Sequence, residues 1–310
     1  MAYSSVFCRS SAKLLIDKKI YLPCRYSRVM GLRTDLATRL IRSTFQQRFL
    51  VARMTQLPVA GKAIEFALFE RDEMIYLPRD DVVKRKVIRL DQEVGATNLV
   101  LPSQVIDHFL KRSRYIFIMN ACMCRDSNHC QNYPHQLGCI FLGKGVIKIP
   151  EKMGHRATPE EAIEHMRKAR EAGLVHLIGR NKIDSVWLNT GPKENLLSIC
   201  NCCQCCCLWK MLPEMNDTIS SGVSRIPGLQ VKVVEERCTG CGACIKDKIC
   251  FTRAISILNG RAHIDDSRCK GCGRCVEFCP SGAVDLTLTD PDYFEKAVRK
   301  IDPLVDISAE

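Results

Sequence analysis

The stretch Cys269-Lys-Gly-Cys-Gly-Arg-Cys-Val-Glu-Phe-Cys279-Pro280 decides the fold of the last part of this chain. Its cysteines are separated by two, two and three residues, and a proline follows the last of them. Three thiolates two residues apart can wrap one face of a cubane cluster, and the glycines between them permit the tight turns that this needs. The spacing therefore predicts a loop that holds an inorganic cluster.

A second version of this pattern lies upstream, as Cys238-x2-Cys241-x2-Cys244-x5-Cys250. It has two extra residues before its fourth cysteine, and Phe251 stands where the other version has proline. A zinc site with four thiolates needs only two cysteine pairs, whereas here each triplet is followed by a lone cysteine. The two patterns together therefore favour iron–sulfur clusters over zinc.

Residues 235–288 resemble the bacterial-type dicluster ferredoxins. Between the two motifs, Ile255–Leu258 and Arg261–Ile264 flank Asn259-Gly260, which predicts the hairpin that such ferredoxins use as a linker. The resemblance implies two 4Fe–4S clusters, each taking its fourth ligand from the opposite motif. It thus implies one cluster on Cys238, Cys241, Cys244 and Cys279, and another on Cys269, Cys272, Cys275 and Cys250.

The composition is that of a soluble globular protein, with 310 residues, 46% apolar and 26% charged side chains. No apolar run approaches the ~18 residues of a membrane-spanning helix. Lys13, Asp17, Lys18 and Lys19 stand where a secretory signal would need its apolar stretch. We therefore expect a cytoplasmic protein, in which twenty cysteines indicate metal or redox chemistry rather than disulfides.

Residues 1–57 are expected to form a basic, helical segment, with eleven Lys and Arg against Asp17 and Asp35 in residues 1–56. Two apolar stripes at helical spacing run through it, namely Leu32, Leu36, Leu40 and then Ile41, Phe45, Phe49. The segment could dock on an acidic partner or on an anionic membrane surface, while nucleic acid is the partner we do not expect. The alternatives are a helical subdomain with a solvated cationic face, and an organelle transit peptide.

The remainder divides into a small mixed α/β module at 58–113, a cysteine-rich α/β domain at 114–223 and the ferredoxin domain at 224–310, so we expect an α+β protein. Thr158-Pro159-Glu160-Glu161 predicts the start of a helix that ends at Gly173, and a further helix is predicted to begin at Ser103. Apolar runs predict strands at 115–119, 174–178, 186–188 and 196–199. Residues 213–227 are interpreted as the linker to the last domain.

The cysteine-rich domain contains ten cysteines in two groups. The first group is Cys122, Cys124, Cys130 and Cys139, and the second is Cys200, Cys202, Cys203, Cys205, Cys206 and Cys207. Both groups contain Asn-x-Cys-x-Cys after a predicted apolar strand. If those strands lie side by side, Cys122, Cys124, Cys203 and Cys205 approach one another, and the other thiols complete one or two further iron–sulfur clusters.

Zinc is the alternative for this domain, held by Cys122, Cys124 and Cys130 and completed by His129, His135 or Cys139. Unmetallated or redox-active thiols are a third possibility. His165 and His176 are interpreted as structural residues on a helix and a strand. Cys8 and Cys24 lack partners at ligand spacing and are expected to be free thiols.

Residues 100–288 as a whole resemble a group of iron–sulfur proteins from anaerobes that are commonly described only as ferredoxin-type 4Fe–4S binding proteins. The segments that carry the resemblance are Cys-Met-Cys-Arg at 122–125, Gly-Cys-Ile-Phe-Leu-Gly at 138–143, Ala-Gly-Leu-Val-His at 172–176, the six-cysteine run and the ferredoxin tail. The resemblance implies electron transfer in anaerobic metabolism with an unidentified redox partner protein.

Three hypotheses for function follow. The first is an electron carrier or electron-transfer subunit that relays single electrons. The second is a reductase in which the middle cysteines hold a catalytic cluster with an open coordination position. The third is a redox-responsive regulator whose basic segment meets DNA.

Overall fold

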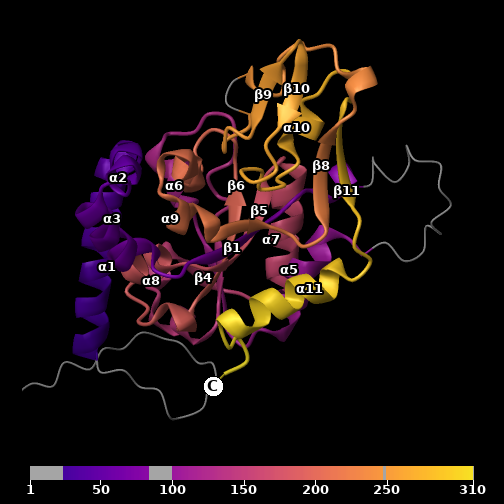
Figure 1. The fold of residues 1–310 in the computed structure, drawn as a ribbon. Helices are drawn as coiled ribbons and strands as arrows, with labels where there is room; N and C mark the ends of the chain where they lie inside the picture. Colours follow the sequence, from indigo (N-terminus) through magenta and orange to yellow (C-terminus); the bar gives the residue numbers. More distant parts are fainter. Residues whose placement is uncertain (1–23, 84–99, 247–248, 310) are drawn as a thin grey trace, which may run out of the picture.

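A seven-stranded sheet organises the computed structural model, which describes residues 24–83, 100–246 and 249–309 (Figure 1). The sheet consists of β1 Glu73–Leu77, β2 Ile116–Met119, β3 Ile140–Leu142, β4 Gly154–Arg156, β5 Val175–Arg180, β6 Leu197–Cys202 and β7 Val223–Arg225. The strand order is β4-β2-β3-β6-β5-β1-β7, and every pair is antiparallel except β1 with β7. Because β1 belongs to this sheet, residues of the predicted 58–113 module and of the cysteine-rich domain share one core.

Helices surround the sheet, which confirms an α+β fold. They are α1 Cys24–Thr44, α2 Arg48–Met54, α3 Pro58–Ile64, α5 Pro102–Arg112, α6 Met123–Ser127, α7 Pro159–Glu171, α8 Lys182–Leu188, α9 Asp217–Ser221, α10 Arg274–Glu277 and α11 Tyr293–Ile301. Short 3₁₀ helices occur at η1 Phe45–Gln47, η3 Lys144–Lys148, η4 Glu151–Met153, η5 Lys193–Asn195, η6 Leu208–Glu214, η7 Glu235–Arg237 and η9 Asp302–Leu304, and η2 Glu65–Phe69 is a short π-helix. No described helix has both the length and the apolar character needed to span a bilayer.

The two faces of the sheet pack against different parts of the chain. Successive strand residues point to opposite faces, so Ile75 and Leu77 join a core with α5 and α7, whereas Met74 and Tyr76 pack with α2 and η2. In Figure 1 the indigo helices α1–α3 accordingly stack along one side of the molecule. The cysteine-rich loops follow β2 and β6, and a cavity that they line is also lined by residues of α1 and α2.

The C-terminal part adds two small antiparallel sheets. One pairs β8 Leu229–Val233 with β11 Val284–Leu288, and the other is the hairpin β9 Ile255–Leu258 with β10 Arg261–Ile264. Asn259 and Gly260 both have positive φ, at 49° and 73°, as a tight hairpin turn of this type requires, and the predicted hairpin is confirmed. Val284 and Leu286 belong to the same buried core as Ile75 and Leu77, so the C-terminal part packs directly on the central sheet.

Several predicted elements are confirmed. Thr158 caps α7, because its Oγ1 accepts the Glu161 N–H at 3.2 Å while the Glu161 carboxylate accepts the Thr158 N–H at 2.8 Å. The helix predicted at Ser103 is α5, and the strands predicted at 115–119, 174–178 and 196–199 are β2, β5 and β6 within two or three residues.

Other predicted elements are wrong. The apolar run at 186–188 is the end of helix α8, which begins because the Asn181 side chain accepts the Asp184 N–H. The predicted linker at 213–227 contains α9 and the sheet strand β7. The strands β2 and β6 are not neighbours either, because β3 lies between them. Since β2 and β6 are both antiparallel to β3, their ends nevertheless open at the same edge of the sheet.

Candidate metal centres

The eight ferredoxin-type cysteines lie around two cavities. Cys238, Cys241, Cys244 and Cys279 line one cavity, and Cys250, Cys269, Cys272 and Cys275 line the other. Each set combines three cysteines of one motif with the fourth cysteine of the other motif. The backbone conformation makes this possible, since Gly240 and Gly271 turn their loops at φ of 68° and 65°, values that side chains disfavour.

Backbone N–H groups point at several of these sulfurs. The Ala254 N–H donates to Cys250 Sγ at 3.2 Å, the Ala283 N–H donates to Cys279 Sγ at 3.2 Å, and the Ala262 N–H donates to Cys238 Sγ at 3.3 Å. Hydrogen bonds to cluster sulfurs stabilise the reduced, more negative form and raise the reduction potential. The donors around these sulfurs therefore fit an iron–sulfur cluster in each cavity.

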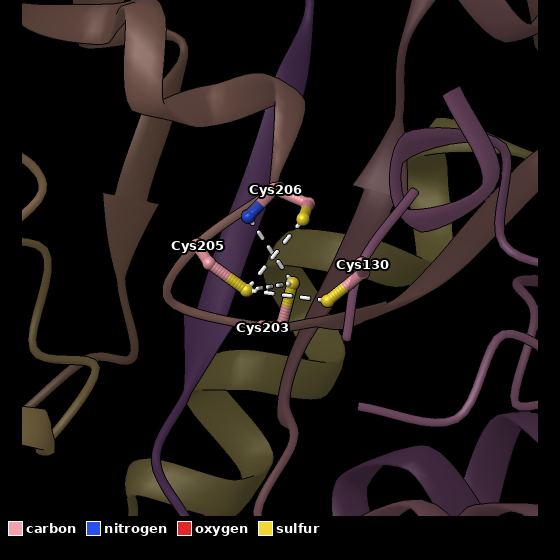
Figure 2. A group of neighbouring side chains, drawn as sticks. All are labelled: Cys130, Cys203, Cys205 and Cys206. Carbon is pink, nitrogen blue, oxygen red and sulfur yellow. Dashed lines mark hydrogen bonds between the residues drawn. The ribbon is translucent and has the colours of Figure 1, made fainter. Parts of the chain in front are cut away.

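The ten cysteines of the middle domain form two groups that differ in geometry. The compact group consists of Cys130, Cys203, Cys205 and Cys206, whose sulfur atoms all lie within 4.8 Å of one another. Figure 2 shows the four sulfur atoms converging on one point from two separate segments of the chain. The other six thiols form an extended series, which we call the six-thiol chain.

The six-thiol chain runs from Cys124 through Cys122, Cys139, Cys200 and Cys202 to Cys207. Side-chain hydrogen bonds join Cys124 to Cys122, Cys122 to Cys139, Cys139 to Cys200 and Cys200 to Cys202. Cys207 Sγ donates to Cys202 Sγ at 3.1 Å. All six residues line one cavity of about 400 Å³ between the sheet edge and the helices α1 and α2, and Cys203 of the compact group borders the same cavity. The remaining wall is largely apolar and includes Phe45, Phe69, Phe141 and Trp187.

Two thiols of this chain are stabilised as thiolates. Hydrogen bonds from Cys200 and Cys207 lower the pKa of Cys202 to about 5. Hydrogen bonds from Cys124 and Cys139 likewise hold the pKa of Cys122 well below its usual range. A thiolate is the form that binds metals, so the cavity presents metal-binding sulfur at neutral pH.

Two arginines supply positive charge beside these thiolates. Burial by itself would lower the pKa of the Arg125 guanidinium, but the neighbouring cysteines, with the Cys122 thiolate first among them, outweigh burial and raise it. Arg125 is fully buried and donates to the carbonyl oxygen of Asn201 at 2.7 Å and to that of Leu137. Burial lowers the pKa of Arg48, which lies over the ring of Phe45 in the wall of the same cavity.

The grouping of the middle cysteines differs from the one predicted from the repeated Asn-x-Cys-x-Cys pattern. Cys122 and Cys124 belong to the six-thiol chain, whereas Cys203 and Cys205 belong to the compact group. The strand β3 lies between β2 and β6, which were expected to be neighbours. Cys139, which directly precedes β3, therefore lies beside Cys122. Neither His129 nor His135 is among the ligands of the compact group. His135 Nε2 lies 2.7 Å from the Cys130 carbonyl oxygen and holds that loop in place.

The second ferredoxin-type cavity adjoins the six-thiol chain. Tyr76 is fully buried, and burial is the main cause that raises the pKa of its hydroxyl. The neighbouring Cys207, Cys202 and Cys272 raise this pKa further. Its ring lies 5.1 Å from that of Phe251, which lines the cavity around Cys272. Arg274, inside the second motif, donates to the Cys202 carbonyl oxygen at 2.8 Å. Contacts made by Tyr76, Phe251 and Arg274 thus connect the two sites.

Comparison with known protein families identifies one segment of the chain. Residues 262–285, which include Cys269, Cys272, Cys275 and Cys279, match the 4Fe-4S binding domain family. The C-terminal part therefore contains a ferredoxin-type iron–sulfur domain that supports at least one 4Fe–4S cluster and electron transfer. Comparisons with curated proteins and with solved structures give no match.

Four residues that shape these sites are not among those predicted from the sequence, namely Arg48, Tyr76, Arg125 and Arg274. Arg125 directly follows Cys124, and Arg274 lies between two cysteines of the second motif, so their positions offered a signal. Tyr76 and Arg48 are far from any cysteine in the sequence, and only the packing of β1 and α2 brings them to the thiols.

Proposed function

We propose that this protein transfers single electrons through two 4Fe–4S clusters in its C-terminal part to a centre in the cysteine-rich middle domain. The observation that carries the proposal is the sorting of eight cysteines around two cavities, four to each, with the fourth member exchanged between motifs. Cys238, Cys241, Cys244 and Cys279 would hold one cluster, and Cys250, Cys269, Cys272 and Cys275 the other. Each cluster, when bound, supplies a reversible one-electron couple.

The solvent exposure of the cysteines differs between the two cavities, and this difference suggests the order in which electrons pass through the proposed clusters. Cys241 is exposed, and Phe278 nearby in the second motif is 37% exposed, so an external redox partner can approach the first cavity. Cys275 is buried, and Cys272 lies beside Tyr76 and the six-thiol chain. Electrons would enter at the first cluster, pass to the second and leave through the contact with the middle domain.

Two cysteine variants test the ligand assignment. Cys250→Ala and Cys279→Ala should each lose one cluster's iron, about four atoms per chain, and keep the other cluster, because each removes one ligand from a different cavity. The measurement is iron and sulfide content with EPR of the reduced protein after anaerobic purification. Cys8→Ala is the matched control, since Cys8 is expected to be a free thiol, and it should keep all the iron. Unchanged iron and visible absorption in both variants would refute the proposal.

A second candidate, a reductase, is favoured by one observation. The six-thiol chain lines a cavity of about 400 Å³ whose remaining wall is largely apolar but includes the cation Arg48, so a small molecule could reach a metal centre there. For a centre with an open coordination position, an alkyl isocyanide should change the EPR signal of the reduced middle domain. Phe45→Trp narrows the cavity and should block this change, whereas Leu258→Trp, on the exposed hairpin, should not. An EPR signal that is insensitive to the isocyanide would eliminate the reductase.

A further inference from the structure

The compact group in the middle domain has sulfur spacings that suit a single metal ion. Cys205 Sγ lies 3.4 Å from Cys130 Sγ, 3.5 Å from Cys203 Sγ and 3.5 Å from Cys206 Sγ. An ion that binds four thiolates tetrahedrally at about 2.3 Å sets neighbouring sulfurs about 3.8 Å apart. The three distances from Cys205 are thus within a few tenths of an ångström of this value, and no other pair of the four sulfurs exceeds it by more than about 1 Å.

A cubane cluster needs a wider arrangement, because each of its four irons binds a different thiolate. The same chain provides the comparison. Around the two ferredoxin-type cavities, no three thiols of the described residues lie within 4.8 Å of one another, whereas all four thiols of the compact group do. The chain thus builds two kinds of four-cysteine site, and the compact one is too small for a cubane.

The protein buries three of the four thiols of the compact group. Cys130, Cys203 and Cys206 are buried, at 8%, 4% and 4% exposure, and Cys205 is partly buried. The Cys206 N–H donates to Cys203 Sγ at 3.3 Å, and the Asn128 amide donates to the carbonyl oxygens of Cys124 and Cys206. Four protein ligands with no open position are typical of structural zinc, whereas catalytic zinc keeps a position for water.

Local structure explains how Cys130 reaches the other three thiols. Helix α6 ends at Ser127, and His129 adopts a left-handed conformation with φ of 48°, which reverses the chain. The Cys130 N–H then donates back to the Arg125 carbonyl oxygen at 3.0 Å. This turn directs the Cys130 thiol toward the 203–206 loop, as Figure 2 shows. The site joins two segments more than seventy residues apart in sequence.

We propose that Cys130, Cys203, Cys205 and Cys206 bind one zinc ion that clamps the loop after β6 to the segment after β2. The clamp has a consequence for the neighbouring cavity. Cys124 precedes Cys130 on one clamped segment, and Cys207 directly follows Cys206 on the other, and both belong to the six-thiol chain. The zinc ion would therefore fix the two ends of that chain, while the six remaining thiols stay available for a redox centre.

The test uses the full chain, purified anaerobically from medium that contains both iron and zinc. We expect about one zinc per chain and a zinc X-ray absorption spectrum with four sulfur neighbours at about 2.3 Å. Cys130→Ser should lose most of this zinc and keep the EPR signals of the ferredoxin-type clusters. Cys139→Ser is the matched control, because it removes a thiol of the six-thiol chain and should keep the zinc.

The zinc X-ray absorption spectrum is recorded on the unmodified protein, so it tests the proposal even if Cys130→Ser fails to fold. Iron in place of zinc at the site, or zinc with nitrogen or oxygen neighbours, would overturn the proposal. So would equal zinc content in the Cys130→Ser and Cys139→Ser proteins. If the unmodified protein instead binds zinc but shows no EPR signals of ferredoxin-type clusters, the result counts against the proposed electron-transfer function and not against the zinc site. Failure of the zinc proposal and failure of the proposed function can therefore be distinguished.

Discussion

Replacement of Arg125 by methionine should destabilise the protein by about 3–6 kcal/mol. The guanidinium is fully buried and donates to two backbone carbonyl oxygens, those of Asn201 and Leu137. A hydrogen bond to a charged group contributes about 1.5–3 kcal/mol, and methionine would leave both carbonyls buried without this donor. Methionine retains most of the apolar volume of arginine, so the loss reports the polar contacts and not a large cavity.

The assay is urea unfolding of the anaerobically purified protein, followed by far-UV circular dichroism, with the slope m compared between variants. Arg125→Lys retains the positive charge but cannot donate to both carbonyl oxygens as the forked guanidinium does. Its stability should therefore lie between that of the unmodified protein and that of Arg125→Met. Arg167→Met is the control, because Arg167 is half exposed and pairs with Glu164 and Glu171 on the helix surface, and it should not shift the midpoint measurably. An Arg125→Met protein within about 1 kcal/mol of the unmodified protein would refute the reasoning.

Three further predictions concern a turn, a histidine and the contact between sites. Gly240→Ala should lose cluster iron, because the added Cβ would lie 2.0 Å from the Gly260 carbonyl oxygen. Gly260→Ala is the control, because Gly260 has a similar φ but an added Cβ there would meet no atom within 4 Å, and it should keep the iron. Equal iron content in the two variants would contradict this account. Burial lowers the pKa of His176 to about 3, so between pH 6.5 and 3 the unfolded chain binds a proton that the folded chain does not. Stability should therefore fall as the pH drops below 6.5, by at most about 1.4 kcal/mol per unit, and urea unfolding of His176→Gln should lack this slope. Under the proposed function, Tyr76→Leu should slow electron arrival at the middle domain in stopped-flow reduction while Tyr76→Phe should not, and equal rates would remove Tyr76 from the pathway.

Elements specified by neighbouring residues could be predicted from the sequence. The Asn259-Gly260 turn and the Thr158 cap were predicted correctly because the residues that satisfy the backbone lie within a few positions of one another. The run at 186–188 was predicted wrongly for a related reason. Three apolar residues suit a strand or a helix equally, and the deciding cap, Asn181, lies five residues upstream.

The pairing of strands could not be predicted from the repeated Asn-x-Cys-x-Cys pattern. That pattern correctly suggested that the loops after β2 and β6 open at the same edge of the sheet. It could not show that β3 lies between these strands, because strand order depends on contacts between residues far apart in sequence. The insertion of β3 moves Cys139 beside Cys122 and leaves Cys203 and Cys205 to join Cys130.

The sequence by itself determined the chemistry of the C-terminal part, because the ligands within each motif are held in short loops whose spacing and glycines set their geometry. Only the tertiary structure decided how the ten middle thiols divide between a compact group of four and an extended chain of six. A cysteine at the end of β6 can face either side of its loop, and its orientation depends on α2, β3 and the turn at His129, which lie at least fifty residues away in sequence. Packing also brings to the thiols two residues that lie far from any cysteine in the sequence, namely Arg48 and Tyr76.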